Sequence, residues 1–591
     1  MWLGGLHIRS YIVGQMISTS PVAPVALSPD RLAADLAALA AEPLDVLVIG
    51  GGIVGAGTAL DAVTRGLRVG VVEAQDWASG TSSRSSKLIH GGLRYLQMHD
   101  FSLVREALHE RSVLLQISPH LVHPVPFIYP LRHRFFERAY VGLGILLYDL
   151  LARTTRTGAG MPFHRQLSRR RAHELAPALR ERRFIGAVQY YDGQVDDARH
   201  TLSVLRTAAS HGAFVASRLQ AVALLRERDR VTGARLRLVE TGQELEVRAR
   251  VVVSATGVWT EDFEGIADIE RDLKMKIQPS KGVHLVVPRR CIDSSTALIL
   301  PTEKSVLFAL PWGEHWLVGT TDTNWAHDRA RPTATAVDVD YLLATLNEAL
   351  ESPLSRADVE SVYVGLRPLI AGAGDETTKL SREHAVNCPL PGLVLVSGGK
   401  YTTYRVMARD AVDAAVEHAR LSAAPCRTER TPIVGADGFA EAWESRLTLA
   451  AHHGLPVVEI ERLLRRYGSL VGEFFAAAAC NPLALVPLAG ASSYLQAEVA
   501  YAVTHEGARH LDDVLERRTR LAIETRDRGT VAAEEVAAIM APLLGWTEAI
   551  VTDEVEAYRA TVGAEVAAEQ EPNDALADAH MNKVVPFLPT P

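Results

Sequence analysis

The sequence is poor in cysteine and has no long apolar run. Its four cysteines are Cys291, Cys388, Cys426 and Cys480, and none of them forms a CxxC pair. It therefore predicts neither a disulfide framework nor a zinc site, and we expect no metal. No stretch supplies the roughly 20 apolar residues that a membrane-spanning helix requires. The formal net charge of -8 does not suit general nucleic-acid binding, so no nucleic-acid partner is expected.

Lysine is also scarce, because only eight of the 62 basic residues are lysines. Arginine stands wherever a surface needs only positive charge. A lysine retained in such a chain hints at a site that requires a compact or titratable ammonium group, and chance retention is the alternative. Lys87 and Lys400 are of particular interest because they lie inside motifs described below.

A strand, turn, helix and strand follow one another near the start of the chain. Leu44 to Gly50 is a short apolar run rich in β-branched residues, which is typical of a buried parallel strand. A helical pattern follows from Ile53 to Arg65, and Arg68 to Glu73 has the pattern of a second strand. This order predicts a right-handed βαβ unit.

The turn of this unit carries the GxGxxG spacing of a dinucleotide site. Gly50 permits the tight turn, Gly52 lets the backbone approach a pyrophosphate, and Gly55 lets the helix pack on the strand. The helix N-terminus offers free N–H groups to phosphate oxygens. Glu73 closes the second strand, where a carboxylate accepts hydrogen bonds from the adenosine ribose. The motif alone does not distinguish FAD from NAD.

Two later segments favour FAD. Val251 to Gly257 is a strand that ends in Ala-Thr-Gly, as in many flavoproteins with two dinucleotide folds. Gly398 and Gly399 follow another strand and open a helix that starts near Thr402, which gives a second helix N-terminus.

The distribution of elements predicts an α/β fold. We expect a Rossmann-like, two-dinucleotide-fold FAD domain, an interleaved mixed β-sheet substrate domain and a C-terminal all-helical domain. The expected boundaries are an N-terminal extension at 1–42, partly disordered, a discontinuous FAD and substrate domain at 43–425, a helical domain at 431–567 and a disordered tail at 568–591.

One apolar segment has two interpretations. Ala139 to Tyr148 contains no charge, and arginines stand on both sides of it. It is too short to span a bilayer. It can lie in a membrane interface with its arginines at the head groups, or it can be a buried core helix.

The block Thr81 to Leu96, TSSRSSKLIHGGLRYL, is dense in hydroxyl groups, glycines and basic groups. With this block the chain resembles the membrane-associated, respiratory FAD-dependent glycerol-3-phosphate dehydrogenases. The resemblance continues through VDDAR (195–199), ATGVW (255–259), KGVHLVVP (281–288), GTTDT (319–323), GLRPL (365–369) and GGKYTTYR (398–405), and more weakly through RRYGS (465–469) and LERRTRL (515–521). One departure is His200 after VDDAR, where an apolar residue is more usual.

The resemblance implies an oxidoreductase with non-covalent FAD. It implies oxidation of sn-glycerol 3-phosphate to dihydroxyacetone phosphate, with hydride transfer from C2 to flavin N5 and electrons passed to a membrane quinone. It also implies a homodimer attached peripherally to the cytoplasmic face of the cell membrane. The alternatives are a glycerol-3-phosphate oxidase that uses oxygen, a related flavoprotein acting on amines or other hydroxy acids, and a non-catalytic FAD-binding scaffold.

The substrate chemistry selects the candidate residues. An arginine fork matches phosphate oxygens in pairs, so Arg367, Arg94 and Arg382 are the candidates for a phosphate clamp. His90 and Lys400 are rival candidates for the base that takes the hydroxyl proton. Other substrate contacts are expected from Tyr95 and Thr323. The residues expected to bind the cofactor are Gly50, Gly51, Gly52, Gly55, Glu73, Thr81, Ser82, Ser86, Lys87, Gly257, Gly399 and Thr402.

Overall fold

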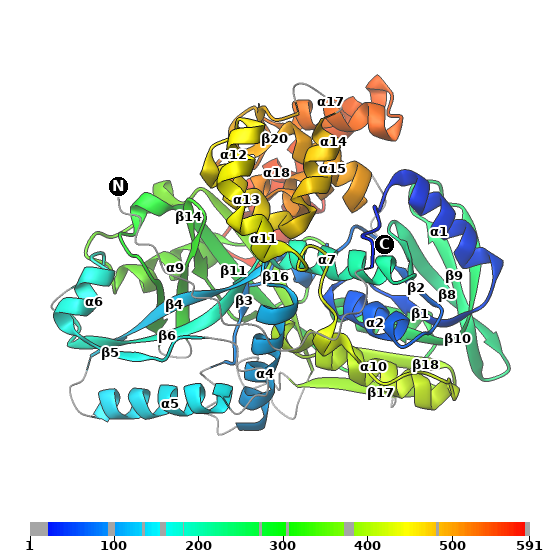
Figure 1. Ribbon diagram of the computed structural model, residues 1–591, viewed down its shortest axis with the longest axis horizontal. Coiled ribbons are helices and arrows are strands. Elements are labelled where there is room, and N and C mark those ends of the chain that lie inside the picture. Colours follow the sequence, from blue (N-terminus) through cyan, green and yellow to red (C-terminus); the bar gives the residue numbers. More distant parts are fainter. Residues whose placement is uncertain are drawn as a thin grey trace.

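The computed structural model describes residues 22–92, 101–132, 136–153, 161–180, 183–270, 275–302, 306–370, 383–479 and 484–584. Two β-sheets lie side by side, and helices from the C-terminal part of the chain sit above their junction in the view of Figure 1. The predicted α/β fold with interleaved sheets and a helical C-terminal part is confirmed.

The first sheet is the dinucleotide layer, and its central strands are parallel. In spatial order these are β18 (Leu393–Gly398), β10 (Glu244–Ser254), β1 (Leu44–Ile49), β2 (Val69–Val72) and β7 (Phe214–Ala216). The antiparallel strand β17 (His384–Leu390) closes one edge, and β8 (Leu219–Glu227) and β9 (Arg230–Leu238) extend β10.

Both faces of this sheet are buried. Val46 and Val48 of β1 face a core that includes α2 (Ile53–Thr64), which packs between α7 (Asp197–Ser210) and α10 (Tyr404–Ala419). Leu47 and Ile49 face a second core on the opposite side, because successive strand residues point to opposite faces. Because β1 is buried on both faces, its sequence is a continuous apolar run, as predicted for a buried parallel strand.

The second sheet is mixed and forms the wall of the substrate region. Its spatial order is β15 (Thr323–Asn324), β11 (Ile277–Pro288), β14 (His315–Gly319), β13 (Val306–Trp312), β12 (Ala297–Pro301), β4 (Val122–Leu131), β6 (Gly186–Val195) and β3 (Leu88–Ile89). In addition, β16 (Ser361–Ile370) pairs with β11, and β5 (Arg165–Ser168) pairs with β6.

The C-terminal part consists mainly of helices. These are α11 (Phe439–Glu444), α12 (Arg446–His453), α13 (Val457–Tyr467), α14 (Val471–Ala478), α15 (Gln496–Glu506), α16 (Leu521–Glu524), α17 (Ala533–Leu544) and α18 (Glu548–Ala568). A small antiparallel pair, β19 (Pro487–Leu488) with β20 (Ala491–Leu495), interrupts them and was not expected from the sequence.

Two helices lie within the segments predicted as an extension and a tail. In the expected disordered tail, Asp574–Met581 forms helix α19, whose N-cap Asn573 accepts a hydrogen bond from the Leu576 N–H. In the expected extension, α1 (Pro29–Ala41) packs against β7 and β10. Order at Asp574–Met581 was not predicted, because it depends on the burial of Ala577 and Met581 and on the pairing of Asp574 with Lys281, 293 residues away. Helix α1 is compatible with the predicted extension, which was expected to be only partly disordered.

Buried ion pairs join the helical part to the dinucleotide layer. Asp196 and Asp197, at the start of α7, both accept hydrogen bonds from Arg520, and Asp76 accepts from Arg517 and Arg518. Arg199 pairs with Glu506 in the same region. Separating such pairs would leave buried charges uncompensated. The VDDAR and LERRTRL motifs therefore serve to dock the two parts of the molecule.

Candidate functional site

A cavity of about 650 Å³ lies between the two sheets. Its lining comes from the turn after β1, the end of β10, the segment 79–92, strand β16 and the turn after β18. The segments after β1, β10 and β18 lie at the carboxyl ends of parallel strands. Ligands bind at this edge in open α/β sheets.

Two glycines at the turn after β1, Gly50 and Gly55, leave no room for a side chain. Gly50 has φ +115°, and a Cβ placed there would stand 2.5 Å from the Ala255 carbonyl oxygen. A Cβ on Gly55 would stand 1.8 Å from the Gly50 oxygen, so this glycine permits the contact of α2 with the turn. Gly52 caps α2 and lines the cavity, whereas Gly51 and Gly55 lie behind the lining.

Glu73 closes β2 at the rim of the cavity. Its carboxylate accepts hydrogen bonds from the Gly51 N–H at 2.6 Å and from the Gln75 N–H at 2.8 Å. Burial raises the pKa of Glu73, while the two N–H donors oppose that shift. The carboxylate thus fixes the glycine turn as well as lining the cavity.

The hydroxyl-rich segment 81–86 runs along the cavity. Ser82 Oγ accepts a hydrogen bond from the Ile53 N–H at 2.9 Å, in the first turn of α2. Thr81 Oγ1 donates to the Leu366 carbonyl at 2.6 Å, and Ser86 Oγ lies 2.9 Å from His284 Nε2. Thr81, Ser82 and Ser86 all line the cavity, so they remain candidates for contacts with the cofactor.

Lys87 was predicted to contact the cofactor, but it does not line the cavity. Its side chain is fully buried, and Nζ donates to Asp197 and to the Ser83 carbonyl, both at 2.5 Å. Burial and the Arg520 charge lower its pKa to about 8, although Asp197 opposes this. Lys87 instead holds the segment 83–87 on the start of α7.

His90 and Lys400 both line the cavity. Thr402 Oγ1 accepts from the His90 N–H at 3.1 Å and donates to the His90 carbonyl at 3.2 Å. These two bonds join the segment of His90 to the turn that carries Lys400. Gly399 (φ +75°) and Gly257 (φ +56°) also line the cavity, in backbone conformations that favour glycine.

Arg367 projects from β16 into the same cavity. Its Nη1 donates to Ser280 Oγ at 3.3 Å and to the Thr321 carbonyl at 3.2 Å, and its Nη2 donates to Thr320 Oγ1 at 3.3 Å. Asp322 Oδ1 lies 3.7 Å from Nη1. The guanidinium is thereby held against β11, with its side chain about one quarter exposed.

Not every predicted substrate residue reaches this site. Thr323 was predicted to contact the substrate, but it is exposed in β15 and does not line the cavity. Its neighbours Thr321 and Asp322 line the cavity instead. Arg94, Tyr95 and Arg382 lie outside the described residues.

His284 lines the cavity and was missed in the sequence. Its ring stacks on Tyr363, with centroids 4.7 Å apart, and its Nε2 meets Ser86. Burial, with the charges of Arg367 and Lys87, holds its pKa well below 6.5. The signal was present, because His284 stands in the motif KGVHLVVP, but that motif served only to support the family resemblance.

His200, the departure from the family pattern, is also buried. Its Nδ1 lies 3.1 Å from the Tyr401 hydroxyl, and its Nε2 lies 3.4 Å from Ser118 Oγ. Burial lowers its pKa to about 3. The histidine is therefore neutral in the folded protein and supports Tyr401, which lines the cavity.

Lowering the pH from 7 to 5 is expected to destabilise the protein. Burial lowers the pKa of His120 to about 3 and that of His123 to about 4, as it does for His200 and His284. Below pH 6.5 the unfolded chain protonates these groups and the folded chain does not, which costs about 1.4 kcal/mol per pH unit and histidine. Thermal unfolding followed between pH 5 and 8 measures the slope.

A matched variant isolates the contribution of one histidine. His200→Gln is expected to make the slope below pH 6.5 shallower, and an unchanged slope would contradict the assignment.

His510 has the opposite effect on the pH dependence of stability. Burial opposes its charge, but hydrogen bonds to Glu240 and Glu554 outweigh burial and raise its pKa to about 9. Its stabilising contribution is complete below pH 6.5 and is lost as the pH rises through 9.

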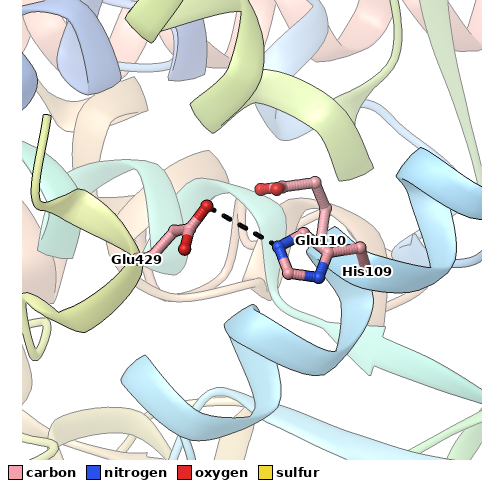
Figure 2. A group of neighbouring side chains, drawn as sticks. All are labelled: His109, Glu110 and Glu429. Carbon is pink, nitrogen blue, oxygen red and sulfur yellow. Dashed lines mark ion pairs between the residues drawn. The ribbon is translucent and has the colours of Figure 1, made fainter. Parts of the chain in front are cut away.

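A group of possible metal ligands lies apart from the cavity. Figure 2 shows His109 and Glu110, from α4 (Phe101–Ile117), beside Glu429. Glu110 accepts from the Arg405 guanidinium through both oxygens, at 2.8 and 2.5 Å, and Glu429 accepts from the same group at 3.1 Å. The guanidinium already occupies oxygens of both carboxylates, so we assign no metal to the group.

Comparison with known proteins identifies the family. The FAD dependent oxidoreductase family matches residues 45–414, and the C-terminal domain of alpha-glycerophosphate oxidase matches residues 426–551. Glycerol-3-phosphate dehydrogenase 2 of Mycobacterium tuberculosis is 51% identical over 555 residues, which are 94% of each chain. The chain belongs to the FAD-dependent glycerol-3-phosphate dehydrogenases.

Three more distant proteins are also similar to this chain in sequence or in fold. The human mitochondrial glycerol-3-phosphate dehydrogenase is 37% identical, over 90% of this chain and 75% of its own. The crystal structure of the Bacillus halodurans enzyme, complexed with FAD, has a TM-score of 0.75 and 29% identity, covering 91% of this chain and 98% of its own. The L-alpha-glycerophosphate oxidase of Mycoplasma pneumoniae, with 15% identity and a TM-score of 0.51, shares the fold.

The cofactor of this family, FAD, fits the described residues. The N-terminus of α2 opens on the cavity at Gly52, where a side chain would enter the space of a pyrophosphate. Glu73 and the turn at Gly398 and Gly399 line the same cavity. The predicted FAD cofactor is confirmed by the family and by this fit.

Proposed function

We propose that this dehydrogenase oxidises sn-glycerol 3-phosphate to dihydroxyacetone phosphate with non-covalently bound FAD. The observation that carries the proposal is the meeting of Arg367, His90 and Lys400 in one cavity with the dinucleotide turn. The substrate is a small alcohol with a phosphate dianion, so its site needs an anion clamp and a proton acceptor. The names of the relatives support the same substrate.

In this proposal Arg367 binds the phosphate. Its contacts to Ser280, Thr320 and Thr321 orient the guanidinium before the substrate arrives, which reduces the entropy lost on binding. Arg94 and Arg382 are proposed as further clamp residues and Tyr95 as a phosphate or hydroxyl contact. When bound, FAD supplies the acceptor for the C2 hydride at flavin N5.

The C2 hydroxyl proton passes to His90 or to Lys400. Imidazole is the side chain that most often accepts a proton in general base catalysis, which makes His90 a candidate. Lys400 would need to lose a proton before it could act as the base, and burial or a nearby positive charge favours that loss. The pH dependence of kcat/KM for His90→Asn and Lys400→Met separates the two, since only loss of the base removes the acid limb.

Electrons are proposed to pass to a membrane quinone. A quinone analogue under nitrogen should sustain formation of dihydroxyacetone phosphate, and oxygen alone should sustain little. Stoichiometric peroxide without quinone would assign the protein as an oxidase instead. A non-catalytic scaffold would hold FAD that no polyol phosphate reduces.

Helix α5 (Phe136–Arg153) is proposed as the contact with the cytoplasmic face of the cell membrane. Tyr140, Leu143 and Leu150 expose 60%, 66% and 49% of their surface, and they lie on one side of the helix at spacings of three and seven residues. The helix lies along the edge of the molecule opposite the C-terminal helices (Figure 1). Within the described residues no helix is long and apolar enough to cross a bilayer.

Replacing Leu143 and Leu150 by glutamate is expected to abolish co-sedimentation with anionic lipid vesicles. The change removes apolar area from the interface and adds charge that anionic lipids repel. Activity with a water-soluble quinone analogue should stay normal. Leu447→Glu, 62% exposed on α12, is the matched control and should sediment with vesicles like the parent.

Equal binding by the parent and the double variant would reject α5 as the membrane contact.

A homodimer is also proposed, because the motifs of the chain resemble those of a dimeric family. Sedimentation of the purified enzyme at several concentrations tests it.

A further inference from the structure

The C-terminal helix α19 lies against the outer side of the substrate sheet. The Glu571 carbonyl, just before the helix, accepts a hydrogen bond at 2.8 Å from the Ala336 N–H at the start of α9 (Ala336–Asn347). Asp578 Oδ2 of α19 lies 3.8 Å from His327 Nδ1. Asp574, the first residue of α19, pairs with Lys281 of β11. The helix therefore bridges α9, the loop after β15 and strand β11.

Lys281 is the centre of this contact. Its side chain is 2% exposed, and its Nζ donates to Asp338 at 2.6 Å as well as to Asp574. The same oxygen of Asp338 already accepts from the Thr335 N–H and hydroxyl in the capping box of α9. Because Asp338 is shared in this way, Asp574 supplies much of the negative charge that a buried ammonium requires.

The backbone of Lys281 connects this contact to Arg367. Successive strand residues point to opposite faces, so Ser280 lies on the same face of β11 as Gly282, which lines the cavity, while Lys281 points toward α19. Ser280 stands opposite Arg367 in the β11–β16 ladder and accepts its hydrogen bond at 3.3 Å. Ser280 Oγ also donates to Asp322 at 2.5 Å. A shift of β11 at Lys281 would therefore move the groups that hold the guanidinium.

The ring of Trp325 gives a second connection to the cavity. Lys281 Nζ lies 5.5 Å from its centroid, and Trp325 packs in a small core with Val258 and Leu366, both of which line the cavity. The ammonium thus stands directly behind part of the cavity wall.

We propose that Asp574 is a positioning residue for the Arg367 clamp. By neutralising Lys281 it fixes residues 280–282 of β11 and, through Ser280, the orientation of the guanidinium. The inference rests on the proposed function, in which Arg367 binds the substrate phosphate. It gives the C-terminal helix a part in substrate binding, although the helix lies outside the cavity.

The test is steady-state kinetics of Asp574→Asn with glycerol 3-phosphate and a quinone analogue. The variant is expected to raise KM about tenfold with kcat changed less than about twofold, because a small displacement of a binding group weakens binding. Flavin content should stay close to that of the parent, while the unfolding temperature should fall by a few degrees because Lys281 loses one of its two counter-charges. Asp553→Asn, exposed on α18, is the matched control and should leave KM unchanged.

A double variant shows whether Asp574 acts through the clamp. In an Arg367→Met background, Asp574→Asn should lower kcat/KM no further, since the group that it positions is gone. Additive losses, or an unchanged KM in the single variant, would overturn the proposal. Loss of flavin or of thermal stability with a normal KM would overturn it too, by assigning a purely structural role. A parent enzyme that does not oxidise glycerol 3-phosphate would reject the proposed function, and the positioning role with it.

Discussion

Replacing Gly52 by leucine is expected to give a folded protein that holds no FAD. Gly52 caps α2 and lines the cavity, and a Cβ there has only Ser82 Oγ nearby, at 3.1 Å. The protein itself can therefore accommodate a side chain, whereas the pyrophosphate cannot, because the branched group would occupy its place against the helix N-terminus. The flavin absorbance of the purified variant measures the loss.

Gly265→Leu is the control for this experiment. Gly265 is exposed in α8 (Thr260–Ile266), and no atom lies within 4 Å of an added Cβ. This variant should keep its flavin and its unfolding temperature. A yellow Gly52→Leu protein with stoichiometric flavin would place the cofactor somewhere other than the turn after β1.

Replacing Arg367 by methionine is expected to lower kcat/KM for glycerol 3-phosphate about a hundredfold and to leave FAD in place. Two charge-assisted hydrogen bonds to phosphate contribute about 3 kcal/mol, and each 1.4 kcal/mol is a factor of ten. Most of the effect should appear in KM, since the phosphate lies away from the reacting carbon.

The control for Arg367 is Arg248→Met, an arginine 59% exposed on β10, which should behave as the parent. Full turnover of the Arg367 variant at low substrate concentration would show that another group clamps the phosphate. Loss of flavin in this variant would instead assign Arg367 to the cofactor.

The first βαβ unit of the dinucleotide layer could be predicted almost to the residue from local patterns. The run Leu44 to Gly50 and the spacing of Gly50, Gly52 and Gly55 report on burial and close approach, which are properties of neighbouring residues in the chain. The expected helix from Ile53 to Arg65 is found as α2, Ile53–Thr64. Such features depend little on distant parts of the molecule.

The retained lysines show where sequence reasoning reaches its limit. Their scarcity indicated special positions, and Lys87 and Lys281 are both fully buried ion-paired cations, while Lys400 lines the cavity. The sequence could not separate these roles, because the partners Asp197, Asp338 and Asp574 lie 110, 57 and 293 residues away from their lysines. The order of α19 was missed for the same reason.

The central claim, that this flavoprotein oxidises glycerol 3-phosphate, is tested most directly by the flavin absorbance of the purified enzyme. Under nitrogen, glycerol 3-phosphate should bleach the oxidised flavin band rapidly, and a quinone analogue should restore it faster than air does. Flavin that is bound but stays oxidised in the presence of glycerol 3-phosphate would contradict the account.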